Sequence, residues 1–344
     1  MAGRRVGFAR WRSGSPSGGN RYDDELAPRL RGLGIDLRDH LVTGPWPRPA
    51  PGDRDRFATL LDTEPDWLVD NIVGSAAPDA LAAATRAGRR ITLLIHYFPA
   101  DQPGLAAAER DGLVTAEAAA VRAADRVVVT SAWAAGQLSA RYGRGDAVVA
   151  VPGVDPAPLA AGAPAGGPPA LLWLGALTAT KDPLTLVEAL ADLRDLPWTA
   201  RLVGPDGADR RLAGQVRDRV AQTGLAARVQ LTGARTGQAL DAVWHGTDLL
   251  VHTARAETYA MVVGEALARG IASVVATGTG AVEAQGGVGG GFPPGDAAAL
   301  ADVLRGWLTD PALRSRWRSA AAGLRPLRPT WDDTARVVAE ALAG

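Results

Sequence analysis

The stretch DLLVHTARAETYAMVVGEALARGIASVVAT, residues 248–277, decides the fold class. It starts with a short apolar run at 248–253, continues with a helical pattern from Met261 to Ala268 and ends with a second apolar run at 271–277. Parallel strands need a long crossover connection, usually a helix, whereas antiparallel strands can be joined by a tight turn. The stretch therefore predicts an α/β protein built on a parallel sheet.

The same alternation of apolar runs and helical patterns extends in both directions from this stretch. Such alternation predicts a parallel sheet with helices on both of its faces. In the first half we expect strands at 5–9, 66–71, 91–97, 126–131 and 147–152, and helices near 21–31, 77–87 and 106–124. In the second half we expect strands at 170–175, 199–204, 228–233, 248–253 and 271–277, and helices beginning at Pro183, at Met261 and after Asp296.

A run rich in proline, glycine and alanine, PAPLAAGAPAGGPPA at 156–170, lies between the two halves and is typical of a linker. We therefore expect an N-terminal domain at 1–155 and a C-terminal domain at 171–325. The remaining segment, 326–344, contains an amphipathic pattern that predicts a final helix. Open parallel sheets bind ligands at the carboxyl ends of their strands, so two such domains facing each other would form a binding cleft.

The composition excludes several classes of function. Lys+Arg and Asp+Glu both total 37, which argues against a nucleic-acid partner and against attraction to an anionic membrane. The chain has no cysteine, so a disulfide framework, a thiolate zinc site and a cysteine nucleophile are excluded. Neither half has the glycine pattern of a dinucleotide-binding or P-loop enzyme. The sequence shows neither a long apolar run nor a signal peptide, so we expect a cytoplasmic protein.

Two glutamates, Glu257 and Glu265, lie eight positions apart in a run of otherwise small and apolar residues. The N–H groups at the start of the helix at Met261 would favour a phosphate. Glu265 could accept two hydrogen bonds from a ribose diol, and Glu257 could reach a sugar hydroxyl. The alternative is a solvated helix position and an ordinary loop charge.

The stretch RAETYAMVVGEALARG, 255–270, resembles the E-x7-E signature of retaining glycosyltransferases of family 4, which have the GT-B fold. The resemblance covers nearly the whole chain. Further segments similar to that family lie at 123–143, 148–156, 274–284 and 289–304. The resemblance implies two Rossmann-like domains facing across a cleft, with the final helix at 326–344 crossing back to the N-terminal domain. It also implies retaining transfer of a hexose-type sugar from a UDP- or GDP-sugar, without a metal, another cofactor or a protein nucleophile.

The resemblance also assigns roles in the donor site. Glu257 would hold the hexose, Glu265 the ribose, and Lys181, the only lysine of the chain, the diphosphate. Ala176 stands where the family usually has an arginine, and Arg255 or Arg235 could replace it. The other positions expected to contact the donor are Gly18, Gly19, Gly175, Thr178, Gly233, Tyr259, Ala260, Met261 and Val262, with the base near 233–235.

The first half is expected to bind the acceptor. His96 ends a strand and resembles the family's histidine near the donor sugar, so we expect it to be catalytic together with Lys181 and Glu257. Gly18 and Gly19, with Asn20 as a helix cap, would line the cleft, although a plain turn is the alternative. Trp11 and Trp46 could also face an acceptor. The predicted acceptor contacts are Asn20, Tyr22, Asp70, His96 and Tyr97.

Other functions remain open at this point. A nucleotide-sugar epimerase of the same fold, or a nucleotide-sugar-binding protein without transferase activity, would use the same donor site. A phosphorylase is disfavoured because its pyridoxal group needs a lysine, and Lys181 is already assigned to the diphosphate. We expect a small soluble acceptor and little membrane association. The acceptor, the base, the sugar and the oligomeric state are not fixed by the sequence.

Overall fold

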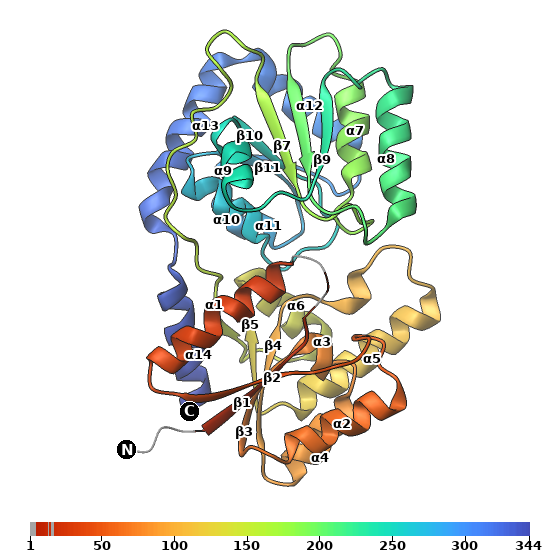
Figure 1. The fold of residues 1–344 in the computed structure, drawn as a ribbon, viewed down its shortest axis with the longest axis vertical. Coiled ribbons are helices and arrows are strands. Elements are labelled where there is room, and N and C mark those ends of the chain that lie inside the picture. Colours follow the sequence, from red (N-terminus) through yellow and green to blue (C-terminus); the bar gives the residue numbers. More distant parts are fainter. Residues whose placement is uncertain (1–4, 13, 15–16) are drawn as a thin grey trace. The chain divides into compact units, whose positions relative to one another are not determined.

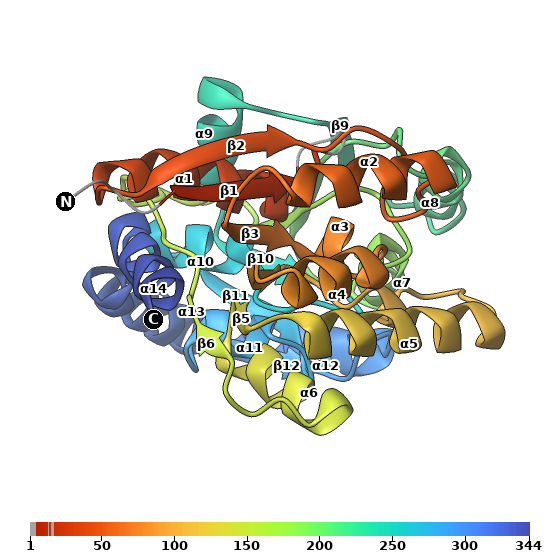
Figure 2. The same cartoon turned by 90° about the horizontal axis from the view of Figure 1, so that it is seen from below.

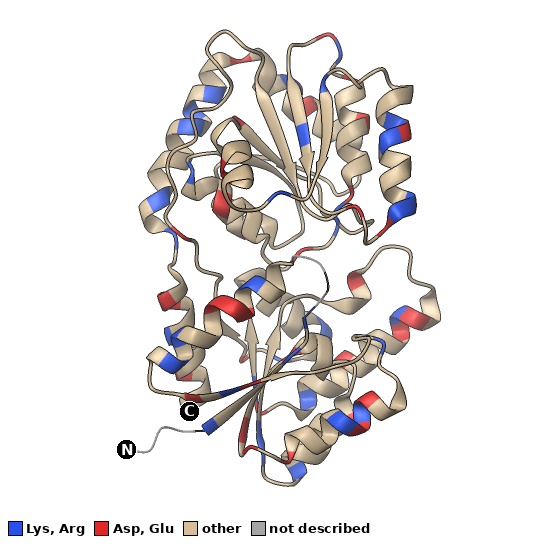
Figure 3. Ribbon diagram, in the orientation of Figure 1, with Lys and Arg blue, Asp and Glu red and all other residues tan. Residues whose placement is uncertain are grey.

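The computed structural model describes residues 5–12, 14 and 17–344. The chain divides into two compact units, one formed by residues up to Gly153 together with Pro329–Gly344, the other by Val154–Arg328. Each unit contains a six-stranded sheet, and all of the strand pairs are parallel (Figure 1). Charged residues of both signs are interspersed along the helices of both units (Figure 3).

The sheet of the N-terminal unit has the strand order β2-β1-β3-β4-β5-β6. Helices α1 and α14 pack together on one side of it, and α2, α4 and α5 pack together on the other (Figure 2). The strands are β1 (Arg5–Arg10), β2 (Asp36–Leu41), β3 (Asp66–Asp70), β4 (Arg90–Ile95), β5 (Arg126–Val129) and β6 (Val148–Val149). The helices are α1 (Gly18–Gly32), α2 (Pro51–Leu61), α3 (Asn71–Gly74), α4 (Pro78–Arg86), a 3₁₀ turn at Pro99–Asp101, α5 (Ala107–Ala123), α6 (Ala132–Tyr142) and α14 (Trp331–Ala343).

The sheet of the C-terminal unit has the strand order β12-β11-β10-β7-β8-β9. Its strands are β7 (Ala170–Leu174), β8 (Thr199–Val203), β9 (Val229–Gly233), β10 (Leu249–His252), β11 (Ala272–Ala276) and β12 (Gly289–Phe292). Its helices are α7 (Pro183–Ala191), α8 (Arg210–Gln222), α9 (Gly237–His245), α10 (Met261–Ala268), α11 (Ala281–Gln285), α12 (Ala297–Thr309), α13 (Pro311–Leu324) and a 3₁₀ turn at Arg325–Leu327. Among the described residues, none of the helices has the length and apolar character that crossing a bilayer requires.

The structure corrects several expected elements. Helix α1 begins at Gly18, and its cap is Ser17, whose hydroxyl accepts from the N–H of Asn20, so Asn20 is not the cap. Strand β2 and helix α2 were not expected. Strand β2 lies at the edge of the sheet and is largely polar, so it lacks the apolar signal of a buried strand. Strand β6 is shorter than the predicted run at 147–152.

The segment expected to be a linker, 156–170, is part of the C-terminal unit. The backbone N–H groups of Ala160 and Gly162 donate to the carbonyl groups of Arg269 and His245, both at 2.9 Å. The carboxylate of Asp248 accepts from the N–H groups of Ala163 at 3.1 Å and Ala170 at 2.8 Å. These bonds hold the segment against the unit, and the boundary between the two units falls at 153–154.

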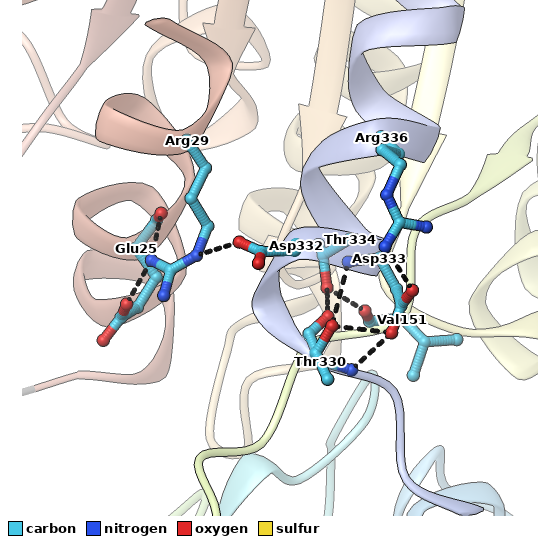
Figure 4. Close-up of polar contacts among 8 residues, drawn as sticks. All are labelled: Glu25, Arg29, Val151, Thr330, Asp332, Asp333, Thr334 and Arg336. Atoms are coloured by element: carbon cyan, nitrogen blue, oxygen red, sulfur yellow. Dashed lines mark hydrogen bonds and ion pairs between the residues drawn. The ribbon is translucent and has the colours of Figure 1, made fainter. Parts of the chain in front are cut away.

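Helix α14 packs within the N-terminal unit. The hydroxyl of Thr334 donates to the carbonyl of Val151 at 2.7 Å, and Arg29 donates to Asp332 at 3.0 Å (Figure 4). Trp331 is buried, and its ring meets that of Tyr22 edge-on at 5.6 Å. The last residues of the chain therefore complete the core of the N-terminal unit.

We predict that Gly153→Ala loosens this packing. A Cβ at Gly153 would lie 2.2 Å from the backbone nitrogen of Trp331, and backbone cannot move aside cheaply. Overpacking of this kind costs about 1–3 kcal/mol, so amides of α14 should exchange hydrogen faster. The control is Gly136→Ala in α6, where a Cβ would meet nothing within 4 Å. It should stabilise the unit by about 0.4–1 kcal/mol. Unchanged exchange in α14 of Gly153→Ala would refute the contact.

Candidate functional site

The strand order of the C-terminal unit reverses between β7 and β10. Strands β8 and β9 follow β7 on one side, and β11 and β12 follow β10 on the other. In such sheets the loops at the reversal point diverge and leave room for a ligand at the carboxyl ends of the strands. The loops after β7 and β10 meet there, because the N–H of Arg255 donates to the carbonyl of Thr180 at 2.8 Å.

Glycines end three neighbouring strands at this edge of the sheet. Gly175 follows β7, Gly204 follows β8 and Gly233 ends β9. The N–H of Gly175 donates to Val203 at 3.0 Å, and that of Gly204 donates to Gly233 at 3.1 Å. A Cβ at Gly204 would lie 1.8 Å from the carbonyl oxygen of Gly175, so only glycine fits there. The edge of the sheet is therefore lined by backbone rather than by side chains. Gly204 was missed by the sequence analysis.

A buried hydrogen-bond network fixes the backbone of Lys181. The indole N–H of Trp173 donates to the hydroxyl of Thr253 at 2.8 Å. That hydroxyl lies 2.9 Å from the carbonyl oxygen of Lys181 and 2.8 Å from that of Asp182, the acceptors for its own hydrogen. Thr253 and Trp173 come from the ends of β10 and β7 and are both buried. They hold the backbone of Lys181 from the interior of the unit. Neither residue was expected from the sequence.

The side chains of Lys181 and Glu257 form an ion pair through Nζ and Oε2. The Nε2 atom of His252 lies 3.3 Å from the same Glu257 oxygen. The side chains of Lys181, Glu257 and His252 are 31%, 16% and 5% exposed. Three groups that are far apart in the sequence thus converge on one carboxylate oxygen. The sequence pattern alone does not single out His252.

These contacts set the protonation of Glu257 and His252. Burial alone would raise the pKa of Glu257, but Lys181 and His252 outweigh burial and lower that pKa to about 2. Burial lowers the pKa of His252 below its ordinary value of 6.5, against the opposing pull of Glu257. At neutral pH the cluster therefore holds a carboxylate, an ammonium and a neutral imidazole.

Arg255 lies in the same pair of loops as Lys181. Its Nε donates to the carboxylate of Asp182 at 2.7 Å, and its side chain is 46% exposed. Asp182 in turn caps α7, accepting from the N–H of Thr185 at 3.3 Å and from its hydroxyl at 2.6 Å. The other candidate cation, Arg235, lies beyond the end of β9 and is exposed. Arg255 is therefore the arginine that the structure brings next to the Lys181 loop.

Helix α10 begins at a strained and uncapped position. Ala260, its N-cap residue, has φ 68° and ψ 73°, and no side chain caps the helix start. This left-handed conformation costs a residue other than glycine about 1–2 kcal/mol. The side chain of Tyr259 turns away into the unit, where its hydroxyl accepts from Arg328 at 2.7 Å. The helix start therefore offers backbone groups, as expected for 259–262, and not the Tyr259 ring.

The remaining predicted donor positions lie around these loops. The Thr178 carbonyl accepts from the N–H groups of Lys181 at 3.1 Å and Asp182 at 3.0 Å, which shapes the loop after β7. Met261, Val262 and Glu265 are the partly exposed residues of the first two turns of α10. Glu265 thus lies on the accessible side of the helix, where a ligand could reach it.

The N-terminal unit contains a second polar cluster at its own reversal point, between β1 and β3. Asp70 ends β3, His96 follows β4, and Asp23 comes from α1. The Nε2 atom of His96 lies 2.9 Å from Oδ1 of Asp23. The backbone N–H of His96 donates to the amide oxygen of Asn71 at 3.0 Å, and the Asn71 amide donates to the Tyr97 carbonyl at 2.7 Å. Asp23 and Asn71 were not among the expected residues.

The charges of this second cluster are not balanced. Burial would lower the pKa of His96, but Asp23 and Asp70 outweigh it and raise that pKa. Burial raises the pKa of Asp70 to about 7, and the nearby Asp23 adds to the rise. Ligand atoms of Asp23, Asp70 and His96 all lie within 4.8 Å of one another, so among the described residues this group could hold a metal ion.

Tyr22 and Trp46, which the sequence suggested could face an acceptor, are interior residues of the N-terminal unit. Tyr22 is 1% exposed, and its hydroxyl donates to the carbonyl of Ala150 at 3.0 Å. Its ring packs edge-on against His96 at 5.2 Å, so Tyr22 supports the histidine from inside the unit. Trp46 is also buried, whereas Trp11 is partly exposed. Gly18 and Gly19 lie in the first turn of α1, and a Cβ at Gly19 would come within 3.5 Å of the His96 ring.

The geometry of the C-terminal unit agrees with its sequence relationships. The model of the family "Glycosyl transferases group 1" matches residues 159–323, nearly all of this unit. The C-terminal unit belongs to this glycosyltransferase family. The resemblance to family 4 glycosyltransferases that the E-x7-E stretch predicted is thereby confirmed.

A curated relative and several solved structures extend the comparison. D-inositol 3-phosphate glycosyltransferase 1 of Catenulispora acidiphila is 32% identical over 229 residues, covering 60% of this chain and 54% of that protein. The chain thus spans about half the length of the curated relative it matches. Sucrose-phosphate synthase from Thermosynechococcus elongatus has a TM-score of 0.82 at 18% identity, with 98% of each chain covered. A glycosyltransferase from Rickettsia africae ESF-5 has a TM-score of 0.76 at 17% identity, with 99% of this chain and 98% of that chain covered.

A third structure, Anabaena Alr3699/HepE in complex with UDP and glucose, has a TM-score of 0.75 at 18% identity, with 99% of each chain covered. At these identities the likeness concerns the fold alone. The predicted α/β architecture with the GT-B fold is confirmed. Within the glycosyltransferase unit, the loops after β7 and β10 are then the place where a ligand is expected.

We predict that the Lys181–Glu257 pair stabilises the glycosyltransferase unit. Lys181→Met would leave a buried carboxylate without its cation, which should cost about 1–3 kcal/mol because Lys181 is itself partly exposed. The double variant Lys181→Met/Glu257→Gln should recover most of this loss. Urea unfolding of the variants measures both changes.

The same pair predicts a pH dependence. The folded-state pKa of Glu257, about 2, lies below its ordinary value of 4.5, so the stabilisation is present above about pH 4.5 and is lost as pH falls toward 2. The control is Arg219→Met, which breaks the exposed Arg219–Glu188 pair and should cost clearly less stability than Lys181→Met, because solvent screens an exposed pair. If Lys181→Met and Arg219→Met lower the free energy of unfolding equally, the Lys181–Glu257 pair does not stabilise the unit more than an exposed pair does.

Proposed function

We propose that the protein is a glycosyltransferase that moves a hexose-type sugar from a nucleotide-diphosphate sugar to a small acceptor, with retention of configuration. The observation that carries this proposal is the convergence of Lys181, Glu257 and the uncapped start of α10 at the reversal point of the sheet. The family of the C-terminal unit supports the activity. A fold neighbour described in complex with UDP and glucose makes a UDP-sugar the first donor to test.

The proposed chemistry begins with the donor diphosphate. The bond between C1 of the sugar and the phosphate oxygen breaks, and negative charge grows on the departing diphosphate. Lys181, Arg255 and the N–H groups at the start of α10 would stabilise that charge, because fixed charges and dipoles aimed at a developing anion lower the barrier. The acceptor oxygen forms a bond to C1 from the same face, and its proton passes to the leaving phosphate. This route requires no covalent protein intermediate.

The two glutamates would hold the polar parts of the donor. An ionised carboxylate can accept two hydrogen bonds, which suits neighbouring hydroxyl groups of a sugar or a ribose. Glu257 is kept ionised by Lys181 and would accept from the hexose. Glu265, on the accessible side of α10, would accept from the ribose hydroxyls. The base would lie near Gly233, where β9 ends in backbone without a side chain.

The N-terminal unit would supply the acceptor side. His96, fixed by Asp23 and Asn71, presents a group with a raised pKa next to Asp70. A hydroxyl group of the acceptor or of the donor sugar is the ligand that such paired donors and acceptors suit. Asn20 and Tyr97, both partly exposed, are further candidates for acceptor contacts. A cytoplasmic location and a small soluble acceptor stay predictions.

The donor site is tested by calorimetry with UDP, GDP, ADP and the corresponding sugar nucleotides. One nucleotide should bind, and Glu265→Gln should weaken it by about tenfold, since one hydrogen bond to a charged group contributes about 1.5 kcal/mol. Glu188→Gln on α7 is the matched control and should leave the affinity unchanged, because Glu188 pairs with Arg219 on the surface. If none of the nucleotides binds, the donor site is not where we place it.

Transfer itself is tested with the donor that binds and a panel of hydroxylated acceptors. Nucleotide release with a glycosylated product, whose anomeric configuration matches the donor, is the expected result. Nucleotide binding with no turnover across the panel would favour a nucleotide-sugar-binding protein. A change in the sugar of the donor without transfer would favour an epimerase.

We also predict that transfer does not need a metal ion. Lys181, Arg255 and the helix start would supply positive charge at the diphosphate in place of a divalent cation. Turnover should survive dialysis against EDTA and should not rise when Mg²⁺ or Mn²⁺ is restored. Loss of turnover with recovery on adding a metal would contradict this prediction. Asp23→Asn would then show whether the cluster in the N-terminal unit holds that metal.

A further inference from the structure

His252 is the least explained member of the Glu257 cluster. It ends β10, and its side chain is buried. Its Nε2 atom is inaccessible to solvent and forms no hydrogen bond of good geometry with any described residue, although Oε2 of Glu257 is only 3.3 Å away. Buried ring nitrogens without a partner are uncommon in native proteins. This nitrogen therefore lies close to Glu257 without a hydrogen bond of good geometry, and a small change in the two side chains would let it form one.

The cluster is electrically balanced only while Lys181 stays with Glu257. Lys181 contributes one positive charge, Glu257 one negative charge, and the neutral imidazole none. The other nearby charges, Asp182 on the cap of α7 and Arg255 in the loop after β10, form their own ion pair. Among the described residues, the charged groups that act on His252 are Glu257 and Lys181.

A bound diphosphate changes this balance. It brings two or more negative charges to Lys181, which is the more exposed member of the pair and can turn toward them. Glu257 would then be a buried carboxylate that shares or loses its cation. Leaving such a charge unpaired is costly, and added negative charge favours protonation of every neighbouring group. Lys181 could leave Glu257 or bridge it to the phosphate. In both cases the added negative charge favours protonation of His252.

We propose that binding of the nucleotide diphosphate at this site is coupled to uptake of one proton by His252, which then replaces Lys181 as the charged partner of Glu257. This proposal rests on the donor site described under Proposed function. The proton comes from solvent and adds to the neutral imidazole, which then carries an N–H on both ring nitrogens. The imidazolium can donate to Glu257 across the short distance already present, so the carboxylate stays ionised and ready to hold the sugar.

The coupling makes donor affinity depend on pH. If binding takes up a proton, affinity strengthens as pH falls, by up to about tenfold per pH unit for one proton. The effect should appear between the pKa of His252 in the free protein, which burial lowers, and the higher pKa that the proposal assigns to it in the complex. It should weaken below this range, where the free protein is already protonated, and above it, where neither state is. A site that merely used His252 for packing would show no such slope from this residue.

The experiment is calorimetry of UDP binding at pH 7 in buffers with different enthalpies of ionisation, which gives the number of protons taken up. The terminal phosphate of UDP titrates near pH 6 and contributes its own proton exchange. The comparison with His252→Gln removes that background. The wild-type protein should take up on the order of one proton more than His252→Gln. His245→Gln, the same change at an exposed histidine of α9, should match the wild type.

A second variant and a direct measurement guard against misfolding of His252→Gln. Glu257→Gln removes the charge that needs a partner, so it should also abolish the extra proton. The chain has only four histidines, so the ring nitrogens of His252 can be followed by NMR. They should change from neutral to imidazolium shifts when UDP saturates the wild-type protein.

Two results would overturn the proposal in distinguishable ways. If UDP binds but the His252 ring stays neutral and the proton count matches that of His252→Gln, the coupling is wrong while the donor site stands. If UDP, GDP and ADP all fail to bind, the donor site itself is wrong, and the coupling falls with it.

Discussion

The C-terminal unit depends on keeping one carboxylate, that of Glu257, ionised where little water reaches it. A buried charge must be paired, and Lys181 supplies the opposite charge from a loop 76 residues away in the sequence. The pair therefore joins the loops after β7 and β10, at the point where the strand order reverses. The two ions that pair in this structure are also the ones expected to meet the donor.

Hydrogen bonds and close packing hold the backbone around the pair. Thr253 and Trp173 hold the backbone of Lys181 from inside the unit. Gly280 lies against the loop that carries Glu257, where a Cβ would be 1.9 Å from the carbonyl oxygen of Thr258. Preorganised charges stabilise a developing anion without reorganising at the moment of reaction. The strained backbone of Ala260 belongs to the same arrangement, because it starts α10 with its N–H groups free of a side-chain cap.

The charged groups at the reversal point of the N-terminal unit are arranged differently from those of the C-terminal unit. There the two carboxylates of Asp23 and Asp70 surround one imidazole, so the group holds more negative than positive charge when both are ionised. The excess is relieved by raised pKa values, whereas in the C-terminal unit the carboxylate is balanced by a lysine and its pKa is lowered. The N-terminal cluster thus favours protonated side chains, whereas the C-terminal cluster keeps its carboxylate ionised. This contrast suits a fold in which one unit binds hydroxyl groups and the other binds an anion.

The sequence by itself determined the α/β class, the two similar halves, the helix at Met261–Ala268 and the family of the C-terminal unit, because these depend on local periodicity and on one contiguous motif. The sequence did not predict strand β2, because that strand is polar and lies at the edge of the sheet. It also predicted a linker at 156–170, whereas this segment forms hydrogen bonds to residues far away in the chain. It also assigned Lys181 and Glu257 to separate parts of a ligand. Only the tertiary structure decided that they form a pair, that His252 and Thr253 complete it, and that Asp23 fixes His96. Burial and partnership arise when residues far apart in the chain meet, so protonation and charge balance cannot be obtained from spacing alone.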